Sequence, residues 1–442
     1  MRHCLECNRK LKMDRKKILI KNISLGLVFK SINMLIVFTT IPILLNYLDK
    51  ELYGIWATIF SLVNIVIFVD GGIGNGLKTK LSEALSQKNF ALAKTYISTA
   101  YVSIIAISFL IFIIAAIFIY VTDFQKLFNT TLLSNGEFQI ILLVTFFLVI
   151  IGFILTLYKS LYYANQQASK VELSLLIYQI IILISITLLM QFYTKSLLLI
   201  AIIYGGSTIL IGGWFSFQFF RKNKQIIPKI SFFSKEKVKS LMGLSLEFFV
   251  IQLSMIVIFT TDNLIITNLI GPKDVATYDV VFKLFNLLIT LSAIALDPLW
   301  ALYTDAFQKK DFTWIKKTLV RLNKLFLVVV LIIIVLYFIA TPFIKFWTQK
   351  DLEILNSLLL LMSLFVLIRI YGLIYMVFLN AIGNIKLQMW MYIFGAIINI
   401  PLSMYLVKNT DLGSGAVILG TILSIISLSI LLPIQTFAIL KK

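Results

Sequence analysis

Thr261-Asp262-Asn263-Leu264-Ile265-Ile266-Thr267-Asn268-Leu269-Ile270-Gly271-Pro272-Lys273-Asp274 joins two long apolar runs at a Gly-Pro turn. The second run carries Lys283 and ends in Asp297-Pro298-Leu299-Trp300, so charged residues lie inside both runs. An ionisable side chain at the centre of a membrane helix costs about 2.5–3.5 kcal/mol even on a lenient insertion scale. Charges that persist in such runs therefore indicate a functional polar pathway.

The composition predicts an all-α polytopic membrane protein. Of the 442 residues, 60% are hydrophobic and only 14% are charged, more apolar surface than a soluble chain of this size can bury. Runs of about 18 or more apolar residues recur, each long enough to cross a hydrocarbon core of about 30 Å as a helix. The first run exceeds a signal-peptide core and lacks a small-residue cleavage site. We predict twelve spans: 22–47, 53–72, 96–121, 138–158, 171–191, 196–220, 242–270, 274–297, 325–347, 354–380, 387–407 and 413–438.

The positive charges lie mainly on one side of these spans. Thirty of the 40 Lys and Arg residues fall in the two termini and in alternate loops, seven fall on the opposite side and three fall inside spans. The positive-inside rule then places both termini in the cytoplasm. Because topology explains the net charge of +20, a nucleic-acid partner is not predicted.

The two cysteines do not predict a metal site. Cys4 and Cys7 form one CxxC beside His3, the only histidine, and this falls short of four zinc ligands. We expect reduced thiols in a cytoplasmic tail, and no cofactor. Met13 precedes an ordinary basic leader, so both Met1 and Met13 are candidate starts.

The sequence predicts two related halves. We predict a basic tail at 1–21, an N-lobe of six helices at 22–220, a cytoplasmic linker at 221–239 and a C-lobe of six helices at 240–440. An offset of 222 residues places Leu48-Asp49-Lys50-Glu51 on Ile270-Gly271-Pro272-Lys273 without a gap. The same offset pairs Asn64 with Asn286 and Lys88 with Lys310. An even number of spans per half makes the repeat parallel, with a pseudo-two-fold axis along the membrane normal and substrate between the lobes.

Three cations fall inside predicted spans, and each has a polar neighbour on its helix face. Lys30 lies near Asn33, Arg369 shares a face with Asn380, and Lys283 lies on a stripe with Asp279 and Asn286. One interpretation is a hydrated cavity in which the three cations hold an anion. The alternatives are that Lys30 extends to the membrane surface and that Lys283 serves only Asp279, four residues away. Arg369 has no acid on its own face.

Acidic residues within the spans are candidates for coupling or gating. Glu247 begins a stripe in span seven that repeats every seven residues through Ser254, Thr261 and Asn268. Asp262 lies about 100° to one side of this stripe. Asp262, Asp279 and Glu247 are therefore predicted to couple or gate transport. The alternative for Asp262 is a structural acid at a helix end, bonded to hydroxyls such as that of Thr261.

These motifs resemble the Wzx-type polysaccharide transporter family, in the superfamily that includes the MATE exporters. The resemblance spans roughly 18–440 and rests on Leu48 to Gly54, the run Asp70-Gly-Gly-Ile-Gly-Asn-Gly, Asp262 with Leu269 to Pro272, and the Asp297-Pro298-Leu299-Trp300 exit. It implies a MATE-like fold of two six-helix pseudo-symmetric lobes that rock between inward-open and outward-open states. The first half departs from the pattern, since Asp49-Lys50 replaces Gly-Pro.

The resemblance also implies a cargo and partners. The cargo is an undecaprenyl-diphosphate-linked oligosaccharide of O-antigen or another surface polysaccharide, moved between leaflets within the membrane lipids. Lys30, Lys283 and Arg369 would hold the diphosphate, and Asn33, Asn64, Asn286 and Asn380 would bond sugar hydroxyls. Polymerase or ligase machinery would act on the product. No nucleotide-binding motif occurs, so energy would come from H⁺ or Na⁺ or from product trapping.

Other functions fit the sequence less well. A MATE-like drug exporter would favour an acidic cavity, whereas span one carries Lys30 and no acid. An enzyme of lipid-linked sugar chemistry would need an acidic pair or a histidine cluster, and none is placed for it. A membrane assembly partner without transport activity is the remaining alternative.

Overall fold

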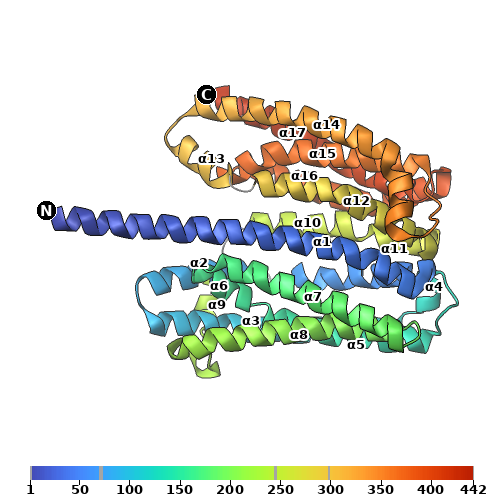
Figure 1. Cartoon of the computed structure of the whole chain (residues 1–442), viewed down its shortest axis with the longest axis horizontal. Helices are drawn as coiled ribbons and strands as arrows, with labels where there is room; N and C mark the ends of the chain where they lie inside the picture. The colour runs from blue at the N-terminus through green and yellow to red at the C-terminus, as the bar shows by residue number, and fades with distance from the viewer. Residues whose placement is uncertain (1, 69–72, 243–245, 297–298, 442) are drawn as a thin grey trace. The chain divides into compact units, whose positions relative to one another are not determined.

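The computed structural model describes residues 2–68, 73–242, 246–296 and 299–441, and these residues form helices joined by short connections, with no strand among them (Figure 1). The side chains of residues 2–24, 27, 64–68, 242, 246, 248, 301 and 305 fall outside that description. The predictions for the Cys4–Cys7 pair, for the Asn64 side chain and for Asp70 and Asp297 therefore lie outside the described residues.

The predicted membrane fold is confirmed. Eleven helices of the described chain are long and apolar enough to cross a membrane. The first, Val28–Val63, lies in α1 (Arg2–Phe68), which is interrupted at Asp49 by non-helical backbone with φ 62° and ψ −179°. The predicted spans 22–47 and 53–72 lie on the two sides of this break, so one observed helix covers two of the twelve predicted spans.

The other long helices follow the predicted spans closely. They are α3 (Phe90–Val121), α5 (Asn135–Leu155), α7 (Ala168–Phe192), α8 (Leu197–Lys222), α10 (Leu246–Thr260), α11 (Asp262–Leu269), α12 (Pro272–Leu296), α14 (Phe312–Thr348), α15 (Asn356–Ala381), α16 (Lys386–Asn409) and α17 (Gly415–Lys441). Short helices connect them: α2 (Ile73–Ser86), α4 (Phe124–Phe128), α6 (Tyr158–Ala164), η1 (Lys224–Ile226), η2 (Ile230–Phe232), α9 (Lys235–Met242) and α13 (Leu299–Gln308).

Some boundaries differ from the prediction. Span seven is not one helix, because Thr261 separates α10 from α11. The sequence predicts span nine from 325, but α14 begins at Phe312, since the helix continues without a break through the basic residues before 325. The predicted linker at 221–239 is partly helical, with η1, η2 and α9 in it.

The chain divides into two compact units. The first comprises Met1–Tyr47, Asp70–Val121 and Gln139–Leu244, and the second comprises Leu48–Val69, Thr122–Phe138 and Ser245–Lys442. The predicted lobe boundaries, at 220 and 240, stay a prediction. The second unit includes residues 48–69 from early in the chain, which matters for the site below.

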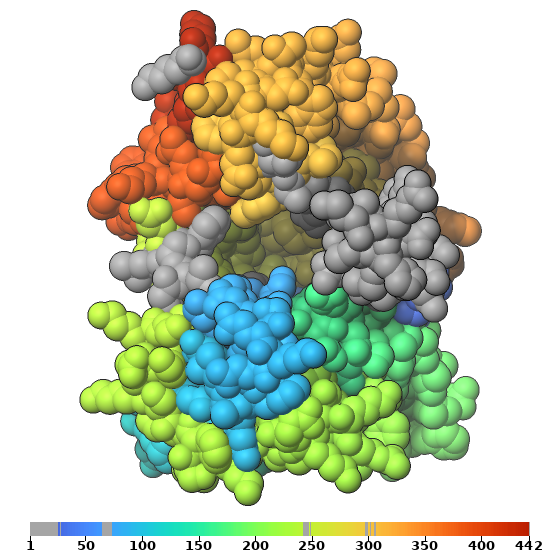
Figure 2. Space-filling view, turned by 90° about the vertical axis from the view of Figure 1, so that its left-hand side faces the viewer, coloured from blue at the N-terminus to red at the C-terminus, as the bar shows by residue number. Residues whose placement is uncertain are grey.

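The first unit is built around a large apolar core. The core joins α2, α3 and α6 to α7 and α8, and its aromatic centre is Tyr158, Tyr162, Phe215 and Phe219. Gly76 of α2 is essential to this packing, because a Cβ there would overlap the carbonyl of Leu241 in α9. Figure 2 shows α2 in blue on the surface of this unit, beside yellow-green residues that include α9.

In the second unit, α15, α16 and α17 lie side by side (Figure 1). Small residues bring these helices close: a Cβ at Gly420 would overlap the hydroxyl of Ser403, and one at Gly395 would press on the carbonyl of Ser424. Such small-residue contacts are typical of helix packing in membranes. They bring the hydroxyls and amides of α16 and α17 near α11.

The internal repeat appears in the backbone itself. Asp49 and Gly271, related by the 222-residue offset, both have positive φ, 62° and 141°. Lys88 and Lys310, related by the same offset, have φ of 55° and 58°. The helices that follow begin at the paired Phe90 and Phe312. A positive φ recurs at both pairs, and φ agrees closely at Lys88 and Lys310, which supports the register that the sequence predicts.

Candidate functional site

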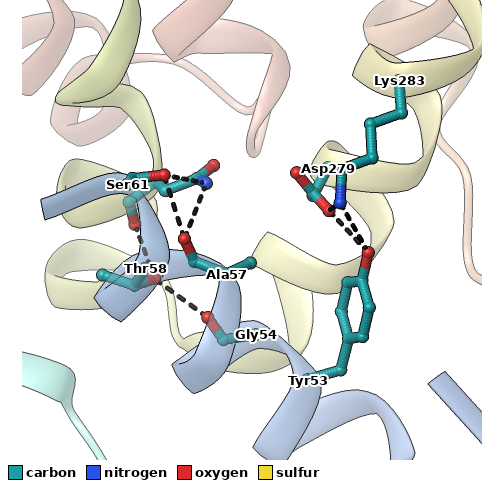
Figure 3. A network of polar contacts seen from close by, with 8 residues as sticks. Tyr53, Gly54, Ala57, Thr58, Ser61, Asp279 and Lys283 are labelled. Carbon is teal, nitrogen blue, oxygen red and sulfur yellow. Dashed lines mark hydrogen bonds and ion pairs between the residues drawn. The ribbon is translucent and has the colours of Figure 1, made fainter. Parts of the chain in front are cut away.

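Two polar clusters in the second unit share helix α12. The first contains Tyr53, Asp279 and Lys283, and we call it the Lys283 cluster (Figure 3). Lys283 Nζ lies 2.6 Å from Asp279 Oδ2. It also donates to the Tyr53 hydroxyl at 3.0 Å, and that hydroxyl donates to Asp279 Oδ2 at 2.6 Å. The predicted Asp279–Lys283 pair is therefore confirmed, and Tyr53 completes a triangle.

Burial sets the strength of this cluster. Tyr53 is 1% exposed, and the Asp279 side chain is 11% exposed. The Lys283 side chain keeps 39% of its surface exposed, so it is less enclosed than its two partners. Taking a carboxylate out of water is expensive unless a cation and hydrogen bonds compensate. Lys283 and Tyr53 supply that compensation for Asp279.

Residues 51–61 are fastened to α11 by further polar contacts, which we call the seam. The hydroxyls of Thr58 and Thr267 lie 2.5 Å apart. Asn263 donates to the Ser61 hydroxyl at 2.8 Å and to the Ala57 carbonyl at 3.4 Å (Figure 3).

Close backbone approach completes the seam. A Cβ at Gly54 would overlap the carbonyl of Pro272, so only glycine permits this contact. Near Pro272, Glu51 pairs with Lys273 at 3.4 Å and accepts from Thr130 at 2.8 Å.

The second cluster surrounds Asp262, which is 4% exposed. Its carboxylate accepts from the Tyr278 hydroxyl at 2.6 Å and from the Thr421 hydroxyl at 3.2 Å. Asn399 donates to Thr421 at 3.1 Å, and Thr261 donates to Asn399 Oδ1 at 3.4 Å. Among the described residues, no Lys or Arg forms an ion pair with Asp262.

The local sequence explains this position. Asp262 begins α11 directly after the break at Thr261, where the positive end of a helix dipole favours an acid. The structural alternative named Thr261 as an example of a hydroxyl partner for Asp262, but the Thr261 hydroxyl donates to Val257 O at 2.7 Å and to Asn399 Oδ1 at 3.4 Å. Hydroxyls from α12 and α17 serve Asp262 instead, because the small-residue packing brings α17 close.

Arg369 of α15 has a different environment from Lys283. Its guanidinium carbon lies 4.3 Å from the centre of the Phe259 ring, and Nη1 donates to the Tyr392 hydroxyl at 3.2 Å. No carboxylate forms an ion pair with it among the described residues. Arg has five N–H donors in a planar fork, and one bond to a hydroxyl leaves most of them for a ligand.

Lys30 and Asn33 belong to the first unit. The Asn33 Oδ1 atom is buried and lacks a donor among the described residues. Glu172 of α7 interacts electrostatically with both Lys30 and Lys159. Sequence reasoning missed Glu172, although an acid one residue inside the predicted span 171–191 was a signal that could have found it.

The remaining predicted residues are dispersed. Asn286 is half-buried on α12, three residues beyond Lys283, and Glu247 is half-buried in the first turn of α10. Asn380 Oδ1, near the end of α15, is buried without a donor among the described residues. The structure thus brings Asp279 and Lys283 together and gives Asp262 and Arg369 separate surroundings. Whether Lys30 joins them around one ligand stays a prediction, because it lies in the other unit.

Family and sequence comparisons agree with this fold. The family model described as "Polysaccharide biosynthesis protein" matches residues 19–297, and the MatE model matches residues 248–405. A Yersinia pseudotuberculosis protein named "Putative O-antigen export protein" is 24% identical over 365 residues, covering 80% of this chain and 81% of that protein.

Solved structures show the same fold. An inward-facing multidrug resistance MATE transporter of the MOP superfamily superposes with a TM-score of 0.72 at 14% identity, covering 94% of this chain and 98% of that one. A MOP superfamily transporter from Pyrococcus furiosus, whose title reports a reversed polarity of the binding pocket, gives 0.66 at 14% identity and covers 97% of both chains.

Proposed function

Because the chain belongs to the polysaccharide biosynthesis protein family, we propose that it is a flippase for an undecaprenyl-diphosphate-linked oligosaccharide. It would carry the unit from the inner to the outer leaflet of a bacterial inner membrane by alternating access, with both termini in the cytoplasm. The export name of the Yersinia relative and the transporter fold support this proposal.

The observation that carries the proposal is that Arg369, on a helix able to span a membrane, has no ion pair among the described residues. A charge in this position is costly, and proteins keep such residues for a function. The Phe259 ring holds the guanidinium plane, and cation–π contact stabilises it by about 0.5–2 kcal/mol without neutralising it. A planar fork that is already oriented binds two oxygens of a diphosphate at once.

Arg369 therefore binds the diphosphate in this proposal, and Lys30 and Lys283 assist when they are not engaged by nearby acids. Asn33, Asn64, Asn286 and Asn380 hydrogen-bond sugar hydroxyls. The lipid tail stays among the membrane lipids, and polymerase or ligase machinery takes the product.

The test is Arg369→Ala, with Arg321→Ala as the matched control because Arg321 is an exposed arginine of α14. Arg369→Ala should abolish surface glycan while the protein still inserts in the membrane at normal levels, and Arg321→Ala should export normally. In proteoliposomes, Arg369→Ala should no longer flip a fluorescent lipid-linked saccharide, whereas Arg321→Ala should still flip it. Normal export by Arg369→Ala would refute the anion site.

Asp262 couples the cycle to an ion in this proposal, with Asp279 and Glu247 as gating acids. Within the described part of the chain, the side-chain donors to this buried carboxylate are neutral hydroxyls, so a bound H⁺ or Na⁺ would offset the cost of burying its charge. The oxygens of Asp262, Thr421 and Asn399 suit H⁺ on the carboxylate or Na⁺ among hard oxygen ligands.

Asp262→Asn tests the coupling role. Transport driven by an imposed pH or Na⁺ gradient should fall by about a hundredfold, the upper range of coupling between sites, while gradient-independent flipping persists. Asp411→Asn, an exposed acid outside the spans, is the control. Gradient-driven transport that is indifferent to Asp262→Asn would leave this residue a structural acid.

A drug exporter is the second candidate, because the MatE model matches residues 248–405. Such an exporter would lower the susceptibility of a sensitised host to cationic drugs. Equal susceptibility with and without the chain, together with restored glycan in a flippase-deficient host, would exclude it.

A further inference from the structure

We infer that the Lys283 cluster is a latch on the seam, opened when the substrate's diphosphate takes Lys283 away from Asp279. This inference rests on the proposed function and adds its regulation. The latch joins residues more than 200 positions apart in sequence, because Tyr53 lies in α1 and Asp279 lies in α12.

The first step of the argument is that the seam is narrow and polar. Residues 51–61 are fastened to α11 by the Thr58–Thr267 contact and the Asn263–Ser61 bond. They are fastened to α12 by the Tyr53–Asp279 bond (Figure 3). Hydrogen bonds of this kind exchange readily for bonds to water, so they can break and reform in each cycle. Apolar contacts of the same extent could not be replaced by hydrogen bonds to water in this way.

The second step is that a backbone break adjoins the seam. Asp49 holds φ 62° and ψ −179°, a region that residues other than glycine rarely adopt. Glu51, two residues after Asp49, is the first residue of the seam and pairs with Lys273. Residues 51–68 can therefore pivot at Asp49 without unwinding the helix on either side.

The third step is competition for one ammonium group. Lys283 has three N–H donors, and the structure assigns one to Asp279 and one to Tyr53. A diphosphate carries more charge than a carboxylate and reaches Lys283 through its exposed surface. Once Lys283 turns to the diphosphate, Asp279 keeps only the Tyr53 hydroxyl, and a buried, uncompensated carboxylate destabilises the closed cluster.

The fourth step links the latch to the Asp262 network. Tyr278, the residue before Asp279, donates to Asp262. A shift of α12 that separates Asp279 from Tyr53 also displaces the Tyr278 hydroxyl. The diphosphate and the coupling ion therefore act on the same turn of one helix, and linkage requires their effects to be reciprocal.

A cysteine cross-link measures the seam directly. Thr58→Cys/Thr267→Cys, in a chain with Cys4→Ser and Cys7→Ser, places two thiols where the hydroxyls are 2.5 Å apart. Cross-linking is followed by counting free thiols with a maleimide reagent after mild oxidation. Gly372→Cys/Ser429→Cys is the control pair, because it joins α15 to α17 away from the seam, where a Cβ at 372 lies 3.1 Å from Ser429 Oγ.

The probes are inorganic diphosphate, undecaprenyl diphosphate and undecaprenyl monophosphate in proteoliposomes. Both diphosphates should slow cross-linking of the seam pair about fivefold, the lower range of coupling between sites, and leave the control pair unchanged. Monophosphate should act less. With Lys283→Gln the response should disappear, whereas Tyr53→Phe should slow cross-linking before any probe is added.

A cross-linking rate that ignores diphosphate while Lys283 is present would overturn the latch, and so would a response that survives Lys283→Gln. Failure of the latch is distinguishable from failure of the flippase proposal. If Arg369→Ala still abolishes export, the flippase function stands and only the latch falls. If Arg369→Ala exports normally, the flippase proposal fails whatever the cross-link shows.

Discussion

Lys283 and Arg369 carry the same charge in one unit of the protein, yet their surroundings differ in kind. Lys283 has its own carboxylate at 2.6 Å and a tyrosine hydroxyl beside it. Arg369 has an aromatic ring and a tyrosine hydroxyl, and no ion pair among the described residues. A cation with a built-in acid contributes to the resting structure, whereas a cation without one awaits a ligand. We therefore propose that Lys283 serves stability and switching, and that Arg369 serves binding.

Loss of the acid at Lys283 should have the largest effect on stability. Asp279→Asn leaves Lys283 uncompensated and should lower the free energy of unfolding by about 2 kcal/mol, less than for a fully buried pair because Lys283 is partly exposed. Asp279→Asn/Lys283→Gln should recover most of the loss. Thermal unfolding in detergent measures both.

The control for that experiment is Glu83→Gln, which breaks the exposed Lys80–Glu83 pair and should leave unfolding unchanged. Equal effects of Asp279→Asn and Glu83→Gln would mean that the Lys283 cluster does not stabilise the resting state. Lys283 and Arg369 would then not differ in their contribution to stability.

A change of shape at constant charge should weaken Arg369. Arg369→Lys keeps the cation but loses the planar fork and its stacking on Phe259. Export should fall by about tenfold, which corresponds to about 1.4 kcal/mol. Flipping rates in proteoliposomes give the ratio. Full activity would show that a point charge suffices and that the guanidinium geometry has no role.

Removal of the Arg369 charge should affect stability little. Arg369→Gln gives up the contact with Phe259 and relieves a charge held in an apolar setting, two effects of opposite sign. We expect the free energy of unfolding to change by less than about 1 kcal/mol while export is lost. A loss as large as that of Asp279→Asn would assign Arg369 a structural role.

The smallest effect concerns the break that adjoins the seam. Asp49→Gly should stabilise the protein by up to about 1 kcal/mol, because glycine adopts φ 62° and ψ −179° without strain. Lys88→Gly is the comparison, since φ 55° at Lys88 is also positive. If Asp49→Gly lowered the free energy of unfolding, the contacts of the Asp49 side chain would stabilise the fold by more than its backbone strain costs.

The helices and the repeat were predictable because their signals are local or periodic. Apolar runs place most of the spans well, although α14 begins at Phe312 rather than at 325. The turns aligned at Asp49 and Gly271 give the 222-residue register. The Asp279–Lys283 pair was predictable too, since both residues lie one helical turn apart on the same helix. The break at Thr261 was not predicted, because the two flanking apolar runs were joined into one span across the polar Thr260-Thr261-Asp262-Asn263.

The long-range partners were not predictable from one sequence. Tyr53 meets Asp279 and Thr421 meets Asp262 only after helices far apart in the chain have packed. No spacing rule relates Tyr53 to Asp279. A threonine in an apolar run usually has no functional role. The pairing of Lys283 with both an acid and a phenol therefore depends on tertiary packing.

The matched bends at Asp49 and Gly271 bear on the origin of the chain. A doubled ancestral gene of half the length would yield two copies of one bend, each begun with the same residue. One copy now has aspartate and the other glycine, although both keep a backbone that favours glycine. Divergence changed the side chain at this position, while both copies kept a positive φ. The bend at residue 49 is therefore held by its surroundings, and a fragment that ended soon after it would straighten.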